Sequence, residues 1–303
     1  KMAISRAQLA KELEPGLNAL FGLEFGRYEN EHSEIFEEES SDRAFEEEVM
    51  LGGFATAPVK SEGGAVSFDD AQETYTARYT HETIALAFSI TEEAIEDNLY
   101  DRLASRYTKA LARSMATTKQ IKAASILNNA FSTGANVIGD GAALCSASHP
   151  SLSGTQTNLL AVAADLNETS LEQMLIDIAG FTDERGLKIA VRGTKLIIPK
   201  ELQFIAERVM NSALRSGTSD NDNNAMKNMG MLPEGAVVNH YLTDTDAYFI
   251  KTDAPNGFKY FNRAAIKTAM EGDFDTGNMR FKARERYSFG VSDWRCVFGT
   301  PGA

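Results

Sequence analysis

The stretch Cys145–His149, with the sequence Cys-Ser-Ala-Ser-His, gathers more side chains capable of chemistry than any other part of the chain. A cysteine and a histidine four residues apart could supply half of a tetrahedral zinc site, which needs four such ligands. No second pair lies nearby in the sequence, and Cys-x-x-Cys does not occur. The sequence therefore predicts no metal site.

The same stretch offers Ser146 or Ser148 as a nucleophile and His149 as its base. A serine nucleophile also needs an orienting group and often sits on a strained turn such as Gly-x-Ser-x-Gly, which is absent. The glycines of residues 134–141 fit neither the dinucleotide-binding pattern nor the phosphate-binding loop. We therefore expect no catalytic residue and no cofactor. A soluble hydrolase using the Cys145–His149 loop stays as an alternative.

Composition places the chain among folded proteins and excludes several other classes. The 303 residues are 43% apolar and 24% charged, which suits one or two domains. Two cysteines are too few for a disulfide scaffold. We find no basic-then-apolar leader and no run of roughly 20 apolar residues, so we expect no membrane contact. With 30 basic and 43 acidic residues, the net charge of -13 argues against a simple nucleic-acid binder.

Residues 1–50 form a strongly acidic segment, with thirteen acidic and five basic residues. Six of the acidic residues form two clusters: Glu37, Glu38, Glu39, Glu46, Glu47 and Glu48. Leucine and phenylalanine between residues 9 and 25 predict a short amphipathic helix, interrupted by Pro15-Gly16. A charged segment with few apolar residues rarely forms its own core. We expect an arm that packs on another surface, such as a neighbouring chain.

Residues 51–90 predict a long β-hairpin. Two sets of side chains alternate here, Thr74, Thr76, Arg78 and Thr80 in one and Tyr75, Ala77, Tyr79 and His81 in the other. The stretch Lys60–Gly64 is rich in turn residues. A hairpin with two largely polar faces is not stable alone in water. It therefore requires a partner surface.

Residues 91–130 predict the strongest helix, because Thr91 can cap it and the run to Asn129 contains neither glycine nor proline. At 1.5 Å per residue it would span roughly 57 Å. Four basic residues share one helix face: Arg102, Arg106, Lys109 and Arg113. This face is either solvated or an electrostatic surface for the acidic arm or for packaged nucleic acid.

The rest of the chain predicts an α/β unit followed by long strands. Ser170 is expected to cap a helix, residues 195–198 to form a buried strand, and residues 201–214 to form a second helix. Residues 216–228 predict a mobile polar loop, and residues 237–250 predict two strands. Further strands are expected at 257–261, 264–270 and 279–291. In the last of these, every second residue up to position 286 is basic: Arg280, Lys282, Arg284 and Arg286.

The order of these elements resembles the Hong Kong 97-like fold of tailed-phage major capsid proteins, and more narrowly the major head subunit of Mu-like phages. Four stretches carry the resemblance across nearly the whole chain: Ala143–Pro150 with Asn158, Ile198–Ala206, Thr243–Phe249, and Arg284–Arg295. The resemblance implies an α+β fold with a peripheral and an axial domain.

The resemblance also implies a division of the chain and a function. It divides the chain as follows: an N-terminal arm at 1–50, an extended loop at 51–90, a peripheral domain with a spine helix at 91–133, an axial domain at 134–255, and C-terminal strands at 256–303. The implied function is a structural subunit whose hexamers and pentamers form an icosahedral shell around double-stranded DNA. Implied partners are further copies of the chain, portal, scaffolding and decoration proteins, and DNA held by weak non-specific contact. The protein would reside in the virion after assembly in the host cytoplasm.

Two further alternatives remain open. An encapsulin-like nanocompartment shell shares the fold but encloses an enzyme instead of DNA. Some members of the fold also join subunits covalently through a lysine of the extended loop and an asparagine of a neighbour. Lys60 lies near the loop tip, but no buried carboxylate is evident around it, so we interpret it as an exposed turn residue. We also hypothesise that acidic arms partly cover the basic helix face.

Overall fold

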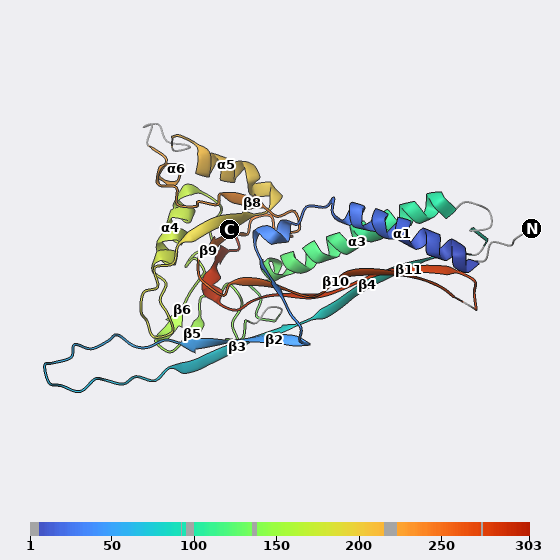
Figure 1. Ribbon diagram of the computed structural model, residues 1–303. Coiled ribbons are helices and arrows are strands. Elements are labelled where there is room, and N and C mark those ends of the chain that lie inside the picture. The colour runs from blue at the N-terminus through green and yellow to red at the C-terminus, as the bar shows by residue number, and fades with distance from the viewer. Residues whose placement is uncertain (1–5, 92, 95–99, 135–137, 215–222, 274) are drawn as a thin grey trace, which may run out of the picture.

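The structure is a computed structural model of the chain. It describes residues 6–91, 93–94, 100–134, 138–214, 223–273 and 275–303, with residues 6–14 and 100–103 described by their backbone alone. The molecule has two parts: an elongated layer of helices on a sheet and, at one end, a compact α/β unit (Figure 1). A long loop projects from the region where the two parts meet (Figure 1). The mixture of helices and sheets confirms the predicted α+β class.

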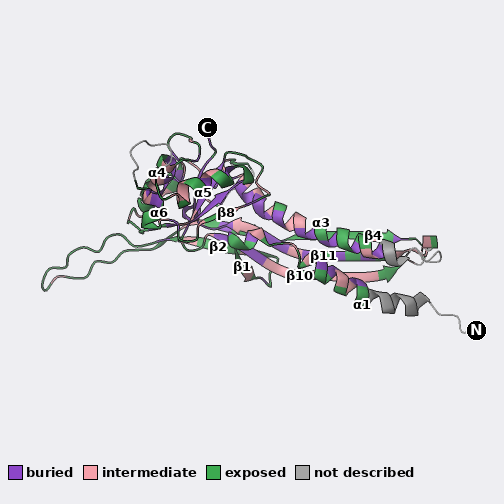
Figure 2. Ribbon diagram, turned by 90° about the horizontal axis from the view of Figure 1, so that it is seen from above, coloured by how far each residue is buried: buried purple, intermediate pink, exposed green. Residues whose placement is uncertain are grey.

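The elongated layer consists of two helices covering a four-stranded sheet in the order β1-β10-β11-β4, referred to below as the main sheet (Figures 1 and 2). Strand β1 runs parallel to β10, and the other neighbours are antiparallel. The elements of the layer are α1 (Arg6–Phe25), α3 (Tyr100–Asn128), β1 (Glu37–Ser40), β4 (Glu82–Ile90), β10 (Phe258–Gly272) and β11 (Met279–Val291). A 3-10 turn at Glu31–Glu34 leads from α1 into the sheet.

Helix α3 lies on the sheet through a face of small and medium apolar side chains, among them Ala104, Leu111 and Met115. Its 29 residues span roughly 44 Å. Thr91 acts as a cap as predicted, because its Oγ1 accepts a hydrogen bond from the Ala94 N–H at 3.4 Å. Residues 95–99 of the predicted helix lie outside the described residues.

Strand β11 confirms the alternation expected from the sequence. Phe281, Ala283 and Tyr287 are buried, whereas Arg280, Lys282 and Arg284 are exposed. Strand β10 differs from the prediction, because residues 258–272 form one strand rather than two. Its pairing with β11 is irregular between Asn262 and Lys267, the place where the sequence suggested a break.

The N-terminal segment packs on its own chain. Helix α1 continues through Pro15, so the predicted break at Pro15-Gly16 is wrong. Leu17 and Phe21 are buried in one cluster with α3 and β11 side chains, and this packing offsets the hydrogen bond that proline cannot make. The chain then supplies β1 to the edge of the main sheet.

The predicted hairpin begins earlier and is shorter than the sequence suggested. Strand β2 (Phe45–Gly52) pairs antiparallel with β3 (Gln72–Thr80), and residues 53–71 connect them without a regular strand. The turn at Glu62 and Gly63 confirms the predicted tip. Residues 82–90 leave the hairpin and join the main sheet as β4, which corrects the predicted boundary at 90.

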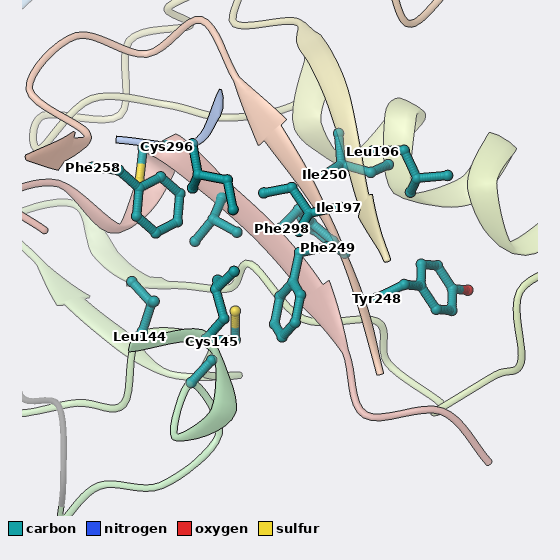
Figure 3. Packing of buried hydrophobic residues seen from close by; sticks show 14 of the residues in the cluster. Leu144, Cys145, Leu196, Ile197, Tyr248, Phe249, Ile250, Phe258, Cys296 and Phe298 are labelled. Carbon is teal, nitrogen blue, oxygen red and sulfur yellow. The ribbon is translucent and has the colours of Figure 1, made fainter. Parts of the chain in front are cut away.

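The α/β unit is built on a second four-stranded sheet in the order β12-β9-β7-β8. Side chains of this sheet and of the chain around Leu144 and Cys145 pack into one apolar core (Figure 3). The unit contains β5 (His149–Ser151), β6 (Gly154–Gln156), α4 (Glu168–Ala179), β7 (Gly193–Ile198), α5 (Gln203–Asn211), α6 (Ala225–Met229), β8 (Ala236–Val238), β9 (Tyr248–Thr252), β12 (Val297–Thr300) and the 3-10 turns Lys200–Leu202 and Trp294–Cys296.

Local sequence signals explain the helices of this unit, with small corrections. Asn167 rather than Ser170 caps α4, and Ser170 completes a capping box by accepting from the Asn167 N–H. The predicted inward face of α4 is buried. Helix α5 ends at Asn211, earlier than predicted. Of the predicted loop at 216–228, residues 225–228 belong to α6, whereas residues 216–222 lie outside the described residues.

Replacing Phe21 by alanine tests the docking of α1 on its own chain. Phe21 is 3% exposed, so Phe21→Ala should lower the free energy of unfolding by about 3 kcal/mol or more. Leu23 on the same helix is 66% exposed, and Leu23→Ala should stay within about 0.5 kcal/mol of the parent chain. Chemical denaturation of the full chain measures both changes. Equal, small effects of the two substitutions would show that α1 does not dock as described.

Candidate functional site

The most exposed feature of the molecule is the loop of residues 53–71, which extends beyond both parts of the fold (Figure 1). Large apolar side chains at and beside this loop face solvent: Leu51, Phe54, Val59, Val66 and Phe68. Val59 is 99% exposed and Phe68 is 95% exposed. A concentration of exposed apolar groups of this kind marks a surface that binds another molecule.

An ion-pair network fixes the base of the hairpin to the main sheet. The ammonium group of Lys259 on β10 is buried and pairs with Glu39 of β1 at 3.1 Å and with Glu48 of β2. Ser292 also donates a hydrogen bond to Glu48. Burial alone would lower the pKa of Lys259, but the hydrogen bonds to Glu48 and Glu39 outweigh it and raise the pKa. The lysine is therefore charged throughout the neutral range, and its stabilisation is lost only as pH rises through that raised pKa.

His81 occupies the single position between β3 and β4, where the chain passes from the hairpin to the main sheet. Its Nε2 lies 2.9 Å from Ser41 Oγ, and its Nδ1 lies 2.9 Å from Ser288 Oγ of β11. Ser41 donates to Glu46, so Nε2–H of His81 donates to Ser41. Burial and the nearby Arg286 lower the pKa of His81, so the ring stays neutral at pH 7.

Two contacts hold the hairpin against the α/β unit. The Arg185 guanidinium donates to the Asp70 carbonyl at 2.7 Å and lies 3.9 Å from the Asp69 carboxylate. Gly139, with φ of +93°, approaches β3 so closely that a Cβ atom would lie 2.5 Å from the Thr76 carbonyl oxygen. The direction of the projecting loop is therefore set from both parts of the fold.

The structure does not bring the predicted acidic clusters and the basic helix face together within one chain. Glu38 accepts from Asn262 at 3.2 Å, and Glu47 pairs with Arg78 at 3.5 Å, in addition to the Lys259 pairs of Glu39 and Glu48. Glu37 is exposed on β1, and Glu46 accepts from Ser41. Three members of the basic face are exposed on α3: Arg106, Lys109 and Arg113. Within the described part of the chain, none of these three pairs with a carboxylate, and the Arg102 side chain lies outside that part.

Lys60 is exposed in the projecting loop, two residues before the turn at Glu62 and Gly63. Among the residues that the structure describes, no hydrogen bond or ion pair reaches its side chain. This environment agrees with an exposed turn residue.

The Cys145–His149 stretch is a buried structural junction. His149 is fully buried, its Nδ1 lies 2.6 Å from Asp140 Oδ2, and its ring stacks on Trp294 with centroids 4.5 Å apart. Its Nε2 lies 3.0 Å from Asn158 Oδ1. The Asn158 amide donates to three main-chain carbonyls, those of Leu144, Trp294 and Val297. Both ring nitrogens of His149 are thus occupied by groups that are not nucleophiles.

Two further observations on the described residues concern catalysis and metal binding. Burial raises the pKa of the Cys145 thiol, which disfavours the reactive thiolate. Among the described residues, no group of three His, Cys, Asp or Glu side chains could hold a metal ion. Of the helices in the described ranges, none is long and apolar enough to cross a membrane.

Sequence reasoning missed the residues that orient the loop, namely Lys259, His81 and Arg185. Around His81 one alternating run ends and another begins. This change of pattern could have located the passage from the hairpin to the main sheet. Lys259 and Arg185 carry no local signal, because their partners are more than 100 residues away in sequence.

Comparison with solved structures identifies the class of fold. The chain is similar to a subunit of the capsid of cyanophage P-SCSP1u, with a TM-score of 0.59, 12% identity, and coverage of 88% of this chain and 86% of that one. It is similar to the capsid of the native GTA particle, with a TM-score of 0.55, 12% identity and 91% coverage of both chains. The virus-like particle from Pyrococcus furiosus gives a TM-score of 0.53 and 10% identity, over 94% of this chain and 97% of that one. The fold is therefore the Hong Kong 97-like capsid fold.

The family follows from the sequence itself. The family model described as "Phage capsid protein" matches residues 74–299, and the chain belongs to this family. No curated protein sequence matches the chain. Membership makes the protein a structural capsid subunit and a virion component rather than an enzyme, which confirms the resemblance at the level of the fold and family.

Replacing Lys259 by methionine tests the network at the hairpin base. Lys259→Met should lower the free energy of unfolding by about 1–3 kcal/mol, less than for a fully buried pair because Glu39 and Glu48 are partly exposed. Thermal unfolding of the full chain measures the change. Lys267→Met on the same strand is the matched control, because Lys267 is exposed. If both variants unfold like the parent chain, the network does not anchor the hairpin.

Proposed function

We propose that the chain is the major capsid subunit, and that its hexamers and pentamers form an icosahedral shell enclosing double-stranded DNA. The observation that carries this proposal is the exposed apolar loop of residues 53–71 on a chain of the phage capsid family. A loop of this kind buries its apolar side chains only against a neighbour. Contacts repeated around rotation axes then close a shell.

The two parts of the fold have separate roles in this proposal. The elongated layer, with the arm at 1–50, the helix within 91–133 and strands β10 and β11 of 256–303, is the peripheral domain. The end of 256–303, with β12, returns to the axial domain. Most of residues 134–255 form the axial domain, which gathers at the centre of each ring. The hairpin within 51–90 lies over a neighbouring subunit. Strand β4, at the end of this range, pairs with β11 in the main sheet.

A groove in the α/β unit suits the ring centre. Its volume is about 580 Å³, and it is lined by α5, α6 and β8. Phe204 and Met229, on α5 and α6, are 76% and 69% exposed. Exposed apolar groups beside a groove favour contact with the next subunit of the ring.

Contacts beyond the shell belong to the same proposal. The basic face of α3 would touch packaged DNA weakly and without sequence preference, and acidic arms of neighbouring subunits would cover part of it. Portal, scaffolding and decoration proteins are the further partners, and assembly would take place in the host cytoplasm. The nearer resemblance to the Mu-like major head subunit stays a prediction, as does the absence of a Lys60 cross-link.

A nanocompartment shell around a protein cargo is the second candidate. The similarity to the virus-like particle from Pyrococcus furiosus over nearly the full length of both chains favours it. The two candidates differ in what the particle contains. Both predict closed shells.

Electron microscopy of the purified full chain tests the proposal directly. We expect closed shells with rings of five and six subunits, and particles from a natural source should hold double-stranded DNA. Small oligomers alone would contradict both candidates. Shells that hold a protein cargo instead of DNA would favour the nanocompartment.

Charge reversal on α3 tests the role of the basic helix face. The double substitution Arg106→Glu and Arg113→Glu should impair assembly or DNA packaging, because it replaces attraction by repulsion. The matched control, Arg106→Lys and Arg113→Lys, keeps the charge and should behave like the parent chain. The yield of filled particles is the measurement. A normal yield from the Glu variant would show that this face is only solvated.

A further inference from the structure

A buried histidine ring lies at each end of β1, the edge strand of the main sheet. His32 is in the 3-10 turn before the strand and is 7% exposed. The Oγ of Ser41, directly after the strand, lies 2.9 Å from Nε2 of the buried His81. We call residues 29–41, which lie between α1 and β2 and include β1, the connecting segment. The two rings therefore lie where the connecting segment joins the rest of the layer.

The amide of Gln120 on α3 can take only one orientation beside His32. Its Oε1 accepts the main-chain N–H of His32 at 3.1 Å, and its Nε2 donates to the Glu29 carbonyl at 3.3 Å. A main-chain N–H can only donate and a carbonyl can only accept, so both contacts would be lost if the amide were turned over. The second hydrogen of Gln120 Nε2 therefore points to Nδ1 of His32, 3.0 Å away, and the ring holds its own proton on Nε2.

This geometry opposes a second proton on the His32 ring. A proton on Nδ1 would face the amide hydrogens of Gln120 instead of an acceptor. Burial is the main reason that the pKa of His32 is lowered, and the ammonium group of Lys119 acts in the same direction, whereas the Glu38 carboxylate opposes it. A hydrogen bond from a side chain often favours the charged ring, but Gln120 offers Nδ1 only a donor. The connecting segment therefore binds with the His32 ring neutral.

The remaining neighbours of the turn do not change this requirement. The rings of Tyr260 and Phe289 pack edge-on against His32, with centroids 5.4 and 5.6 Å away. Three ion pairs lie around the turn: Lys119 with Glu285 at 2.7 Å, Lys195 with Glu34 at 2.8 Å, and His240 with Glu31 at 2.8 Å. The third pair contains a histidine, but its ring is exposed and faces a carboxylate, which favours the charged form rather than the neutral one.

His81 has a similar requirement at the other end of β1, set by different neighbours. Its Nε2–H donates to Ser41, and the guanidinium groups of Arg286 and Arg263 lie close to the ring. Burial is the main cause of the lowered pKa of His81, and both guanidinium groups add to it. The Glu46 carboxylate acts in the opposite direction. Protonation of this ring therefore also works against the attachment of the connecting segment.

We propose that the connecting segment is attached to the layer by an acid-sensitive latch, in which His32 is the principal residue and His81 the second. When the segment opens, the His32 ring reaches water and binds a proton below about pH 6.5. When the segment is attached, the ring stays neutral to a lower pH. The stabilisation is therefore fully present above about pH 6.5 and is lost as pH falls below that value. The latch lies within one chain and does not depend on the formation of shells.

Hydrogen exchange of the full-length, unassembled chain at pH 7 and pH 5, corrected for the intrinsic exchange rates, tests the latch. The main-chain N–H groups of Ile35 and Phe36 donate to the His32 carbonyl, so their exchange measures opening of the turn. Their opening constant should rise about tenfold or more between pH 7 and pH 5, because opening takes up a proton. The buried strand β7 is the internal reference, and its protection should stay the same.

Three substitutions separate the latch from general acid sensitivity. His32→Asn keeps an acceptor near the position of Nδ1 but does not titrate, so most of the rise at Ile35 and Phe36 should disappear. Gln120→Glu has nearly the same shape and offers an acceptor in place of the donor, so the charged ring should bind and the acid response should vanish or reverse. The matched control, His240→Asn, removes the histidine that faces a carboxylate, and the response should be at least as large as in the parent chain.

Several results would overturn the proposal. Equal rises in the parent chain and in His32→Asn would show that another group senses the acid. Equal rises at the turn and in β7 would mean that acid unfolds the whole chain. If His32→Asn leaves the turn open already at pH 7, Gln120→Glu decides, because an acid response as large as that of the parent chain would rule out a latch that requires the neutral ring.

Discussion

The buried ammonium group of Lys259 is the interaction on which the geometry of the subunit depends. It joins β10 to the carboxylates of Glu39 and Glu48, which lie on the two strands that precede the projecting loop. A buried charge without partners is very unfavourable, so the three elements have to stay together once the sheet has formed. The loop direction is therefore determined by the main sheet together with the α/β unit, and not by the loop's own weak structure. His81 adds to this control where the chain passes from β3 to β4, and Arg185 adds to it at residue 70, where the loop returns to β3.

Features that depend on neighbouring residues could be predicted from the sequence, and features that depend on distant ones could not. The alternation in β11 and the inward face of α4 are periodic patterns, and burial follows them closely. Pro15-Gly16 predicts an interruption of the N-terminal helix, but long-range packing of Leu17 and Phe21 overrides that local preference. The transfer of residues 82–90 to the main sheet depends on pairing with β11, about 200 residues later, which no local pattern announces.

The stretches that carry the family resemblance meet in space. His149 stacks on Trp294, and the Asn158 side chain holds the carbonyls of Trp294 and Val297, so the stretch at 143–158 is locked to the end of 284–295. The residues that resembled half of a catalytic or zinc site thus connect the long strands to the α/β unit. Their polar groups satisfy one another inside the protein, which is the usual requirement for buried polar side chains.

The order of strands in the main sheet has a consequence for the timing of synthesis. Among the described strands, β1 pairs only with β10 and β4 pairs only with β11. Residues 37–40 and 82–90 therefore lack these sheet partners until residues 258–291 have left the ribosome. Contacts this distant in sequence form slowly. A nascent chain consequently has no finished layer on which a neighbour could dock. The topology itself delays association until a subunit is nearly complete, which protects a growing chain from joining a lattice prematurely.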